Sequence, residues 1–167
     1  NTPLFNYIKD LSVHGTKTAE VVYGCKGWTA NTTANIWGYT PASGTIIWGL
    51  FPLASSWIAT HLWTQYEYTQ DKKYLAEVAY PLLKGNAEFI LDYMAENPAN
   101  GYLMTGPSIS PENWFKTADG QEMVASMMPT CDRELVYEIF TSCIQAADIL
   151  GIDKAFSNNL QTALAKL

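Results

Sequence analysis

Apolar residues recur every three or four positions along most of this chain, which is the spacing of one helix face. The first such run covers residues 1–14, and Pro3 suits the first turn of a helix. Gly15 is expected to end this helix, and a second short helix is predicted over residues 16–23. The apolar face of the first run consists of Leu4, Phe5, Ile8 and Leu11.

The middle of the chain predicts three further helical runs. Residues 50–68 carry a broad apolar stripe, and Asp71 offers a carboxylate to cap the next helix. Helices are then expected over residues 71–79 and 81–96, with a break or kink at Pro81. The stripe on the first of these helices consists of Leu53, Trp57, Ile58, His61, Leu62 and Tyr68.

The strongest helical pattern covers residues 132–150. Asp132 and Glu134 would lie in its first turn, where carboxylates suit the helix dipole. Gly151 is expected just past its C-terminus, and Asp153 is expected to cap a last helix. That helix keeps an apolar stripe to the end of the chain: Phe156, Leu160, Leu164 and Leu167. The pattern therefore predicts an all-α fold with six or seven helices.

Two stretches lack a helical face and predict long loops. From Gly24 to Gly49, Gly, Asn, Thr and Trp alternate. An irregular stretch of that length is usually functional or disordered, and its three Trp argue against disorder. The second loop covers residues 102–122, where prolines and a glycine forbid a long regular element. In a ring of helical hairpins both loops would lie at the same end and line one cleft.

Glu112, in the second loop, has two interpretations. Pro111 and Glu112 are a common pair at the start of a helix, where a carboxylate is favourable. Alternatively, the rigid loop holds the carboxylate beside the aromatic surface of Trp114 and Phe115. Desolvation there would raise the pKa of the carboxyl, as a general acid requires. The residues alone favour the helix start, and both interpretations stay open at this point.

Composition narrows the classes of partner. Charged residues make up 16% of the 167 residues, below the ~25% of typical soluble proteins, and aromatic residues make up 13%. Such a chain fits a protein that offers flat faces to sugar rings, or one with a large aromatic core. A net charge of −6 without a Lys/Arg cluster argues against nucleic acid. No apolar run approaches the ~20 residues of a membrane-spanning helix, so no membrane partner is expected.

Cysteine and histidine are too sparse for a disulfide framework or a metal site. The three cysteines are widely spaced, and the chain contains only two histidines. One of these, His61, lies on the predicted apolar stripe, where it would be a hydrogen-bonded core residue or a ligand-binding one. The triplet Asn31-Thr32-Thr33 would accept a glycan in a secreted protein. We expect a secreted or periplasmic location, although the chain contains no signal peptide.

Four segments occur in a fixed order: Gly27-Trp28…Asn35-Ile36-Trp37, Trp57…His61-Leu62-Trp63…Tyr66-Glu67-Tyr68-Thr69…Asp71, Tyr80-Pro81-Leu82-Leu83-Lys84-Gly85 and Pro107-Ser108-Ile109-Ser110-Pro111-Glu112-Asn113. Their order and spacing resemble the catalytic domain of glycoside hydrolase family 95, the inverting α-L-fucosidases, which include α-L-galactosidase members. The resemblance covers the whole chain. There are two departures. Asn31-Thr32-Thr33-Ala34-Asn35 stands where the family commonly has His-His-Asn-Thr-Asp, and Thr64 stands where a carboxylate often follows His-Leu-Trp.

The resemblance implies an (α/α)6 toroid of about twelve helices, with residues 1–167 forming a portion of that single catalytic domain. It implies removal of terminal L-fucose or L-galactose from an oligosaccharide or glycan, without a cofactor or metal. The glutamate of the family's Ser-Pro-Glu is the general acid and matches Glu112. The asparagines and aspartate that activate water lie outside the matched region, so the isolated chain would lack them.

Four more residues are candidates for contact with the substrate. Trp37 offers a stacking platform and Asn35 lies beside it in the same loop; loop packing is the alternative for both. Asn113 would bond either a sugar hydroxyl or its own turn, and His61 is the fourth candidate. Two other functions stay open: a non-catalytic carbohydrate-binding helical module, and another (α/α)-toroid carbohydrate-active enzyme such as a polysaccharide lyase.

Overall fold

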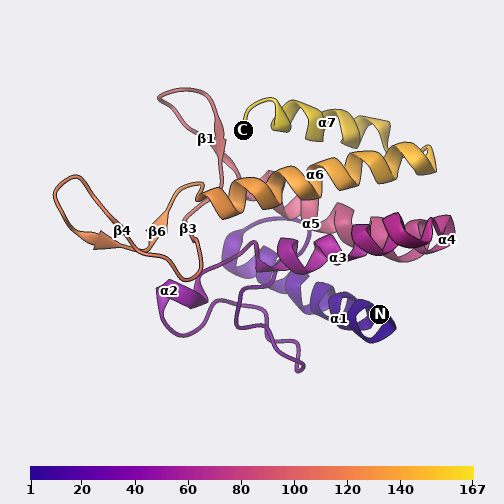
Figure 1. Ribbon diagram of the computed structural model, residues 1–167, viewed down its shortest axis with the longest axis horizontal. Coiled ribbons are helices and arrows are strands. Elements are labelled where there is room, and N and C mark those ends of the chain that lie inside the picture. Colours follow the sequence, from indigo (N-terminus) through magenta and orange to yellow (C-terminus); the bar gives the residue numbers. More distant parts are fainter.

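The protein is described by a computed structural model that covers residues 1–167 (Figure 1). Helices contain 57% of the residues, which confirms the prediction of an all-α fold. The helices are α1 (Thr2–Thr18), η1 (Ala19–Tyr23), α2 (Ile46–Gly49), α3 (Ala54–Thr69), α4 (Lys72–Tyr74), η2 (Leu75–Ala79), α5 (Tyr80–Tyr93), α6 (Thr130–Leu150) and α7 (Lys154–Leu164), of which η1 and η2 are π-helical. Six two-residue strands form three antiparallel pairs: β1 (Ala95–Glu96) with β2 (Leu103–Met104), β3 (Ser108–Ile109) with β6 (Ala125–Ser126), and β4 (Phe115–Lys116) with β5 (Glu122–Met123).

The long helices lie side by side and alternate in direction (Figure 1). α6 packs against α3, α5 and α7, and α1 packs against α3. Tight turns join the helices at one end of this array. The short helix α2 and the strands gather at the other end, on the left of Figure 1. The fold therefore collects its long irregular segments at one end of the helices.

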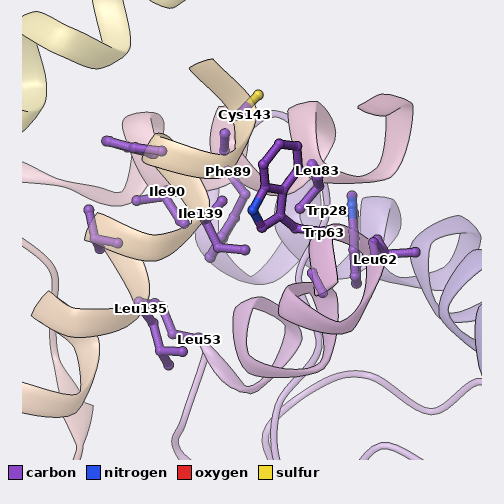
Figure 2. Packing of buried hydrophobic residues seen from close by; sticks show 14 of the residues in the cluster. Trp28, Leu53, Leu62, Trp63, Leu83, Phe89, Ile90, Leu135, Ile139 and Cys143 are labelled. Atoms are coloured by element: carbon purple, nitrogen blue, oxygen red, sulfur yellow. The ribbon is translucent and has the colours of Figure 1, made fainter. Parts of the chain in front are cut away.

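The hydrophobic core lies between α3, α5 and α6, beneath the start of the first loop (Figure 2). Each fully buried aliphatic or aromatic side chain in it stabilises the fold by about 1.5–3 kcal/mol. The side chains that meet there include Trp28, Leu62, Trp63, Leu83, Phe89, Ile90, Ile139 and Cys143.

Gly15 lies inside α1 instead of ending it, so the prediction of a helix break was wrong. A Cβ added at Gly15 would lie only 2.5 Å from the carbonyl oxygen of Thr29. The N–H of Thr29 donates to the carbonyl oxygen of Gly15 at 3.3 Å. This glycine is therefore needed for the close approach of the first loop. The helix continues through η1 and ends at Gly24, which has a φ of 68°.

α3 buries only part of the predicted stripe, because Leu53 and Leu62 are fully buried and the other positions are not. Its buried residues are Ser55, Ser56, Ala59, Leu62, Trp63 and Tyr66. Trp57 and Tyr68 are 57% and 86% exposed, and His61 is exposed as well, so it is not a core histidine. The hydroxyl of Ser55 donates to the carbonyl oxygen of Pro52 at 3.1 Å, which satisfies its donor inside the protein. Small residues and larger ones thus share the packed face of α3, while Trp57, His61 and Tyr68 face outward.

The chain from α4 to α5 is continuous, although a break or kink was predicted at Pro81. The π-helical segment η2 ends two residues before this proline. A proline lacks the N–H of the regular helical ladder, and a π-helical turn changes the hydrogen-bond register there. The predicted cap is confirmed, because the Oδ1 atom of Asp71 accepts from the N–H groups of Lys73 and Tyr74 at 2.9 and 3.0 Å.

The junction between α6 and α7 lies where it was predicted, but Asp153 does not cap α7 as predicted. Gly151, with a φ of 69°, ends α6 as expected. Asp153 precedes α7, yet its side chain makes no capping hydrogen bond. Its Oδ2 atom instead accepts from the hydroxyl of Tyr80 at 2.8 Å and from Nζ of Lys84 at 2.7 Å. These two bonds lower the pKa of the Asp153 carboxyl and fasten the junction to α5.

The structure also bears on disulfides, metal binding, membrane insertion and glycan attachment. Cys25, Cys131 and Cys143 are free thiols, and no three His, Cys, Asp or Glu side chains are grouped as metal ligands. Every helix is too short or too polar to cross a membrane. Asn31 is 1% exposed, and its Nδ2 atom donates to the hydroxyl of Tyr23 and to the carbonyl oxygen of Thr40. A glycan on this atom is incompatible with the fold.

Candidate functional site

The two long loops meet beside Glu112, as predicted. A pocket of about 500 Å³ opens there. The second loop contributes Pro111 and Glu112, the first contributes Thr32, and the chain at the start of α3 supplies a mainly apolar wall. That wall consists of Phe51, Ala54, Trp57 and Ile58. The pocket thus places one carboxylate beside an exposed indole at the end of the array where the irregular segments gather.

The first loop is anchored at its base by buried polar contacts. Trp28 donates from Nε1 to the carbonyl oxygen of Leu82 at 2.8 Å. Thr29 donates from its hydroxyl to the carbonyl oxygen of Pro52 at 2.6 Å. The Nδ2 atom of Asn86 reaches the carbonyl oxygen of Trp28 at 3.2 Å. The base of the loop is therefore ordered by α5 and by the segment before α3, which confirms the prediction of an ordered loop.

The second loop is fixed just before Glu112. The hydroxyl of Tyr93, on α5, donates to the carbonyl oxygen of Pro107 at 2.7 Å. The N–H of Met128 donates to the carbonyl oxygen of Thr105 at 2.9 Å. Strand β3 pairs with β6 through Ser108 and Ser126. These contacts hold the loop from two sides.

Asp132 lies behind this segment and is 0% exposed. Its Oδ2 atom accepts from the hydroxyl of Thr105 at 2.6 Å, and its Oδ1 atom accepts from the hydroxyl of Ser108 at 3.0 Å. Burial raises the pKa of the Asp132 carboxyl to about 6, against the lowering effect of the two hydroxyl donors. The only strongly buried carboxylate of the chain therefore holds the loop that carries Glu112.

Glu112 itself does not start a helix, because the next helix begins only at Thr130. The N–H of Asn113 donates to the carbonyl oxygen of Ser110 at 2.7 Å, which closes a turn around Pro111 and Glu112. The Pro111–Glu112 peptide bond is cis. Glu112 is exposed on this turn and faces the pocket. The helix-start interpretation was therefore wrong.

The apolar surface beside Glu112 comes from α3 and not from the residues that follow it in sequence. Trp114 and Phe115 are 60% and 42% exposed, and neither lines the pocket. Trp57 lines it from the first turn of α3. The sequence prediction missed Trp57 because it placed this residue on the core face. The run of small residues beside it, Ser55, Ser56 and Ala59, was the signal that identifies the packed face of this helix.

The other candidate contacts do not line this pocket. The Oδ1 atom of Asn35 accepts from the N–H groups of Trp37 and Tyr39 at 3.0 and 3.4 Å, which closes a turn at the tip of the first loop. Trp37 is 84% exposed there. The Nδ2 atom of Asn113 donates to the Ser110 hydroxyl at 3.2 Å, so its amide serves its own turn. His61 lies one helical turn after Trp57, on the outer face of α3.

A second acid is missing from the pocket wall. Asp119 and Glu122 lie on the exposed β4–β5 hairpin. A hydrogen bond from the Thr117 hydroxyl lowers the pKa of Asp119, and Glu122 pairs with Lys116 at 3.7 Å. Glu112 is thus the one carboxylate that this chain contributes to the pocket.

An apolar pocket with a few polar groups is typical of a site for a small molecule, and the exposed indole offers a flat face to such a ligand. Comparison with known sequences identifies the family. Residues 1–167 match the sequence profile described as the glycosyl hydrolase family 95 catalytic domain. The chain therefore belongs to glycosyl hydrolase family 95, which confirms the resemblance seen in its motifs.

Two curated relatives carry fucosidase names. The chain is 40% identical over 150 residues to "Alpha-L-fucosidase 2" of Arabidopsis thaliana, which is 89% of this chain and 18% of that protein. It is 28% identical over 166 residues to "Probable alpha-fucosidase A" of Aspergillus niger, which is 96% of this chain and 20% of that protein. The chain thus spans about a fifth of the length of these relatives.

Proposed function

We propose that the protein containing this chain is a glycoside hydrolase of the α-L-fucosidase type, which removes terminal L-fucose or L-galactose from oligosaccharides with inversion. Family membership and the names of the two relatives support this activity. The observation that carries it is the shared pocket of Glu112 and Trp57 at the end of the array where the long loops meet. In an alternative role, non-catalytic carbohydrate binding, the protein would use the same pocket but would release no sugar.

The proposed chemistry divides between two sides of the sugar ring. An inverting hydrolase needs an acid that protonates the leaving oxygen and a base that activates water on the opposite face, with ~6.5–9.5 Å between them. Glu112 is the acid in this proposal. The indole of Trp57 supplies a flat face for the C–H surface of the sugar. The apolar wall suits the C6 methyl group of L-fucose better than the hydroxymethyl group of L-galactose.

The base side of the reaction is assigned to parts of the protein outside residues 1–167. The pocket has one carboxylate from this chain, and the relatives are about five times as long. Asn35, Trp37, His61 and Asn113 stay proposed substrate contacts, in regions of the glycan beyond this pocket. A secreted or periplasmic location also stays a prediction.

The wider architecture we propose is an (α/α)6 toroid in which residues 1–167 are one portion of a single domain. The alternating helix directions and the gathering of loops at one end support it (Figure 1).

The test replaces Glu112 by Gln in the intact protein and compares two substrates. Hydrolysis of a fucosylated oligosaccharide, whose leaving group needs protonation, should fall by about 10²–10⁴-fold. Hydrolysis of α-L-fucosyl fluoride, whose leaving group needs none, should change only a few-fold (~3). Glu122→Gln, on the exposed hairpin, is the matched control and should leave both rates unchanged.

The other outcomes are informative. Oligosaccharide hydrolysis by Glu112→Gln at the wild-type rate would exclude Glu112 as the acid. Calorimetric binding of L-fucosides without sugar release by the unmodified protein would favour the binding module. Unsaturated sugar products would indicate a lyase.

A further inference from the structure

The burial of the Asp132 carboxyl is not explained by a contribution to the stability of the fold. Its carboxyl is 0% exposed, and no Lys, Arg or His pairs with it. An ionised carboxylate buried without a cation costs several kcal/mol of desolvation, which two hydroxyl donors offset only in part. An apolar side chain at this position would avoid that cost. A buried acid that is held in this way therefore suggests a task other than packing.

Both hydroxyl donors belong to the segment that leads to Glu112. Thr105 opens the loop and Ser108 lies on β3, and each bonds a different oxygen of Asp132. Only three residues separate Ser108 from Glu112. A displacement of this anchor is therefore transmitted along a short, turn-closed stretch of backbone to the carboxyl of Glu112.

Asp132 gives the loop a rigid reference. It lies in the first turn of α6, whose following turns are buried in the core through Leu135, Val136 and Ile139. α6 packs against both α3 and α5. Because the wall of the pocket stands at the start of α3, a tie between α6 and the second loop fixes Glu112 relative to that wall. A misplacement of about 1 Å in a reacting group is enough to lower a rate by ~10²-fold.

We infer that Asp132 is a positioning residue for Glu112: its two oxygens hold Thr105 and Ser108 and so set where the acid lies in the pocket. This inference rests on the proposed role of Glu112 as the general acid. Asp132 touches neither substrate nor water in this role. It acts only through the backbone of the second loop.

The test uses Asp132→Asn in the intact protein. The amide keeps the shape of the side chain but offers one acceptor oxygen in place of two. We expect the kcat for a fucosylated oligosaccharide to fall by about 10–100-fold, with its KM within about threefold of wild type. The kcat for α-L-fucosyl fluoride should stay within about threefold, because that substrate needs no acid. Loss of folded protein would lower both rates equally, so the split between substrates separates positioning from stability.

Two further variants sharpen the test. Asp153→Asn is the matched control, since Asp153 also accepts two hydrogen bonds but lies at the α6–α7 junction, and both rates should stay at wild type. The double variant Glu112→Gln with Asp132→Asn should hydrolyse the oligosaccharide no more slowly than Glu112→Gln alone, because an absent acid cannot be misplaced. If Asp132→Asn does not fold, Ser108→Ala removes one of the two bonds and should show the same split at about 3–10-fold.

Failure of the proposed acid and failure of the positioning role give different results. If Glu112→Gln hydrolyses the oligosaccharide at the wild-type rate, the proposed acid is wrong whatever Asp132→Asn does. If Glu112→Gln shows the split and both Asp132→Asn and Ser108→Ala lower the two rates equally, or lower neither, the positioning role is overturned. An additive loss in the double variant also overturns it.

Discussion

Two carboxyl groups of this chain respond to their surroundings in opposite directions. Burial raises the pKa of Asp132 to about 6, whereas hydrogen bonds from Lys84 and Tyr80 lower the pKa of the exposed Asp153. Asp132 therefore favours its neutral form in the folded state, relative to an ordinary carboxyl near 3.8. The loop that carries Glu112 is thus tied to a carboxyl whose pKa is raised by burial.

This raised pKa predicts a pH-dependent stability. Between pH about 4 and about 6 the folded protein binds more protons at Asp132 than the unfolded protein, so the free energy of unfolding falls as pH rises through this window. The loss is at most about 3 kcal/mol. The titratable groups beside Asp132 are Tyr93 and Cys131, whose pKa values are also raised, so both stay neutral there. Denaturant unfolding at pH 4 and pH 7 should show this decrease in the wild type, and Asp132→Asn should lack it. Parallel pH profiles for the two proteins would contradict the assignment.

Trp57 predicts a second effect at the residue scale. Its side chain is 57% exposed and lines the pocket, so Trp57→Ala should weaken substrate binding with little effect on folding. Loss of the stacking face should raise the KM for an L-fucoside by about tenfold, equivalent to ~1.4 kcal/mol. Tyr68→Ala is the control, because Tyr68 lies on the same helix outside the pocket and is 86% exposed. An unchanged KM for Trp57→Ala would remove this residue from the site.

Some of these residues could be predicted from sequence and others could not. Glu112 became a candidate through the family resemblance of its Ser-Pro-Glu motif, since the residues alone favoured a helix start, and its role as the acid stays a prediction. Asp132 was placed correctly in the first turn of its helix, yet its partners lie 24 and 27 residues earlier in the chain. Helical periodicity carries no signal for such a contact, and the helix dipole alone accounts for a carboxylate in a first turn. Trp57 was missed for a similar reason, since its outward direction depends on which neighbours cover the opposite face of α3.

At the scale of the elements, some helix ends were predictable and others were not. Asp71 and Gly151 act through their own backbone neighbourhood, so their sequence positions were sufficient to place a start and an end. The π-helical segments η1 and η2 have no such local signal. The prediction for Gly15 was wrong because the sequence alone does not distinguish a glycine that leaves room for a neighbouring backbone from a glycine that ends a helix.

Gly15 therefore supplies a prediction about α1. Gly15→Ala improves helix propensity by about 1 kcal/mol, but its Cβ would lie 2.5 Å from the carbonyl oxygen of Thr29. The backbone contact cannot relax like a flexible side chain, so a net loss of about 2 kcal/mol is expected. Thr16→Ala, at an exposed position of the same helix, should change stability by less than ~0.5 kcal/mol. Denaturation midpoints of both variants provide the measurement, and a more stable Gly15→Ala would show that the first loop can move away from α1.

At the scale of the whole molecule, the fold separates stability from chemistry. The core lies between α3, α5 and α6, while the pocket lies at the end of the array where α2 and the strands gather (Figures 1 and 2). An all-α fold was predictable because helical spacing is a local property. The closure of the proposed toroid into a ring could not be predicted in this way, because it would depend on helices outside residues 1–167.

The proposed inverting mechanism leads to a prediction about the stereochemistry of the reaction of the complete protein. A retaining mechanism needs a second carboxyl about 5–5.5 Å from the first, close enough to attack the sugar directly. The nearest candidates in sequence, Asp119 and Glu122, lie on the exposed β4–β5 hairpin and do not line the pocket. Glu112 is the one carboxylate that residues 1–167 contribute to the pocket, and in the proposed inverting mechanism water attacks from the opposite face under the control of residues elsewhere in the protein. Proton NMR of an α-L-fucoside digest, recorded before the product mutarotates, should show β-L-fucose first. The α anomer as first product would contradict the inverting mechanism and would require a nucleophilic carboxylate that residues 1–167 do not supply to this pocket.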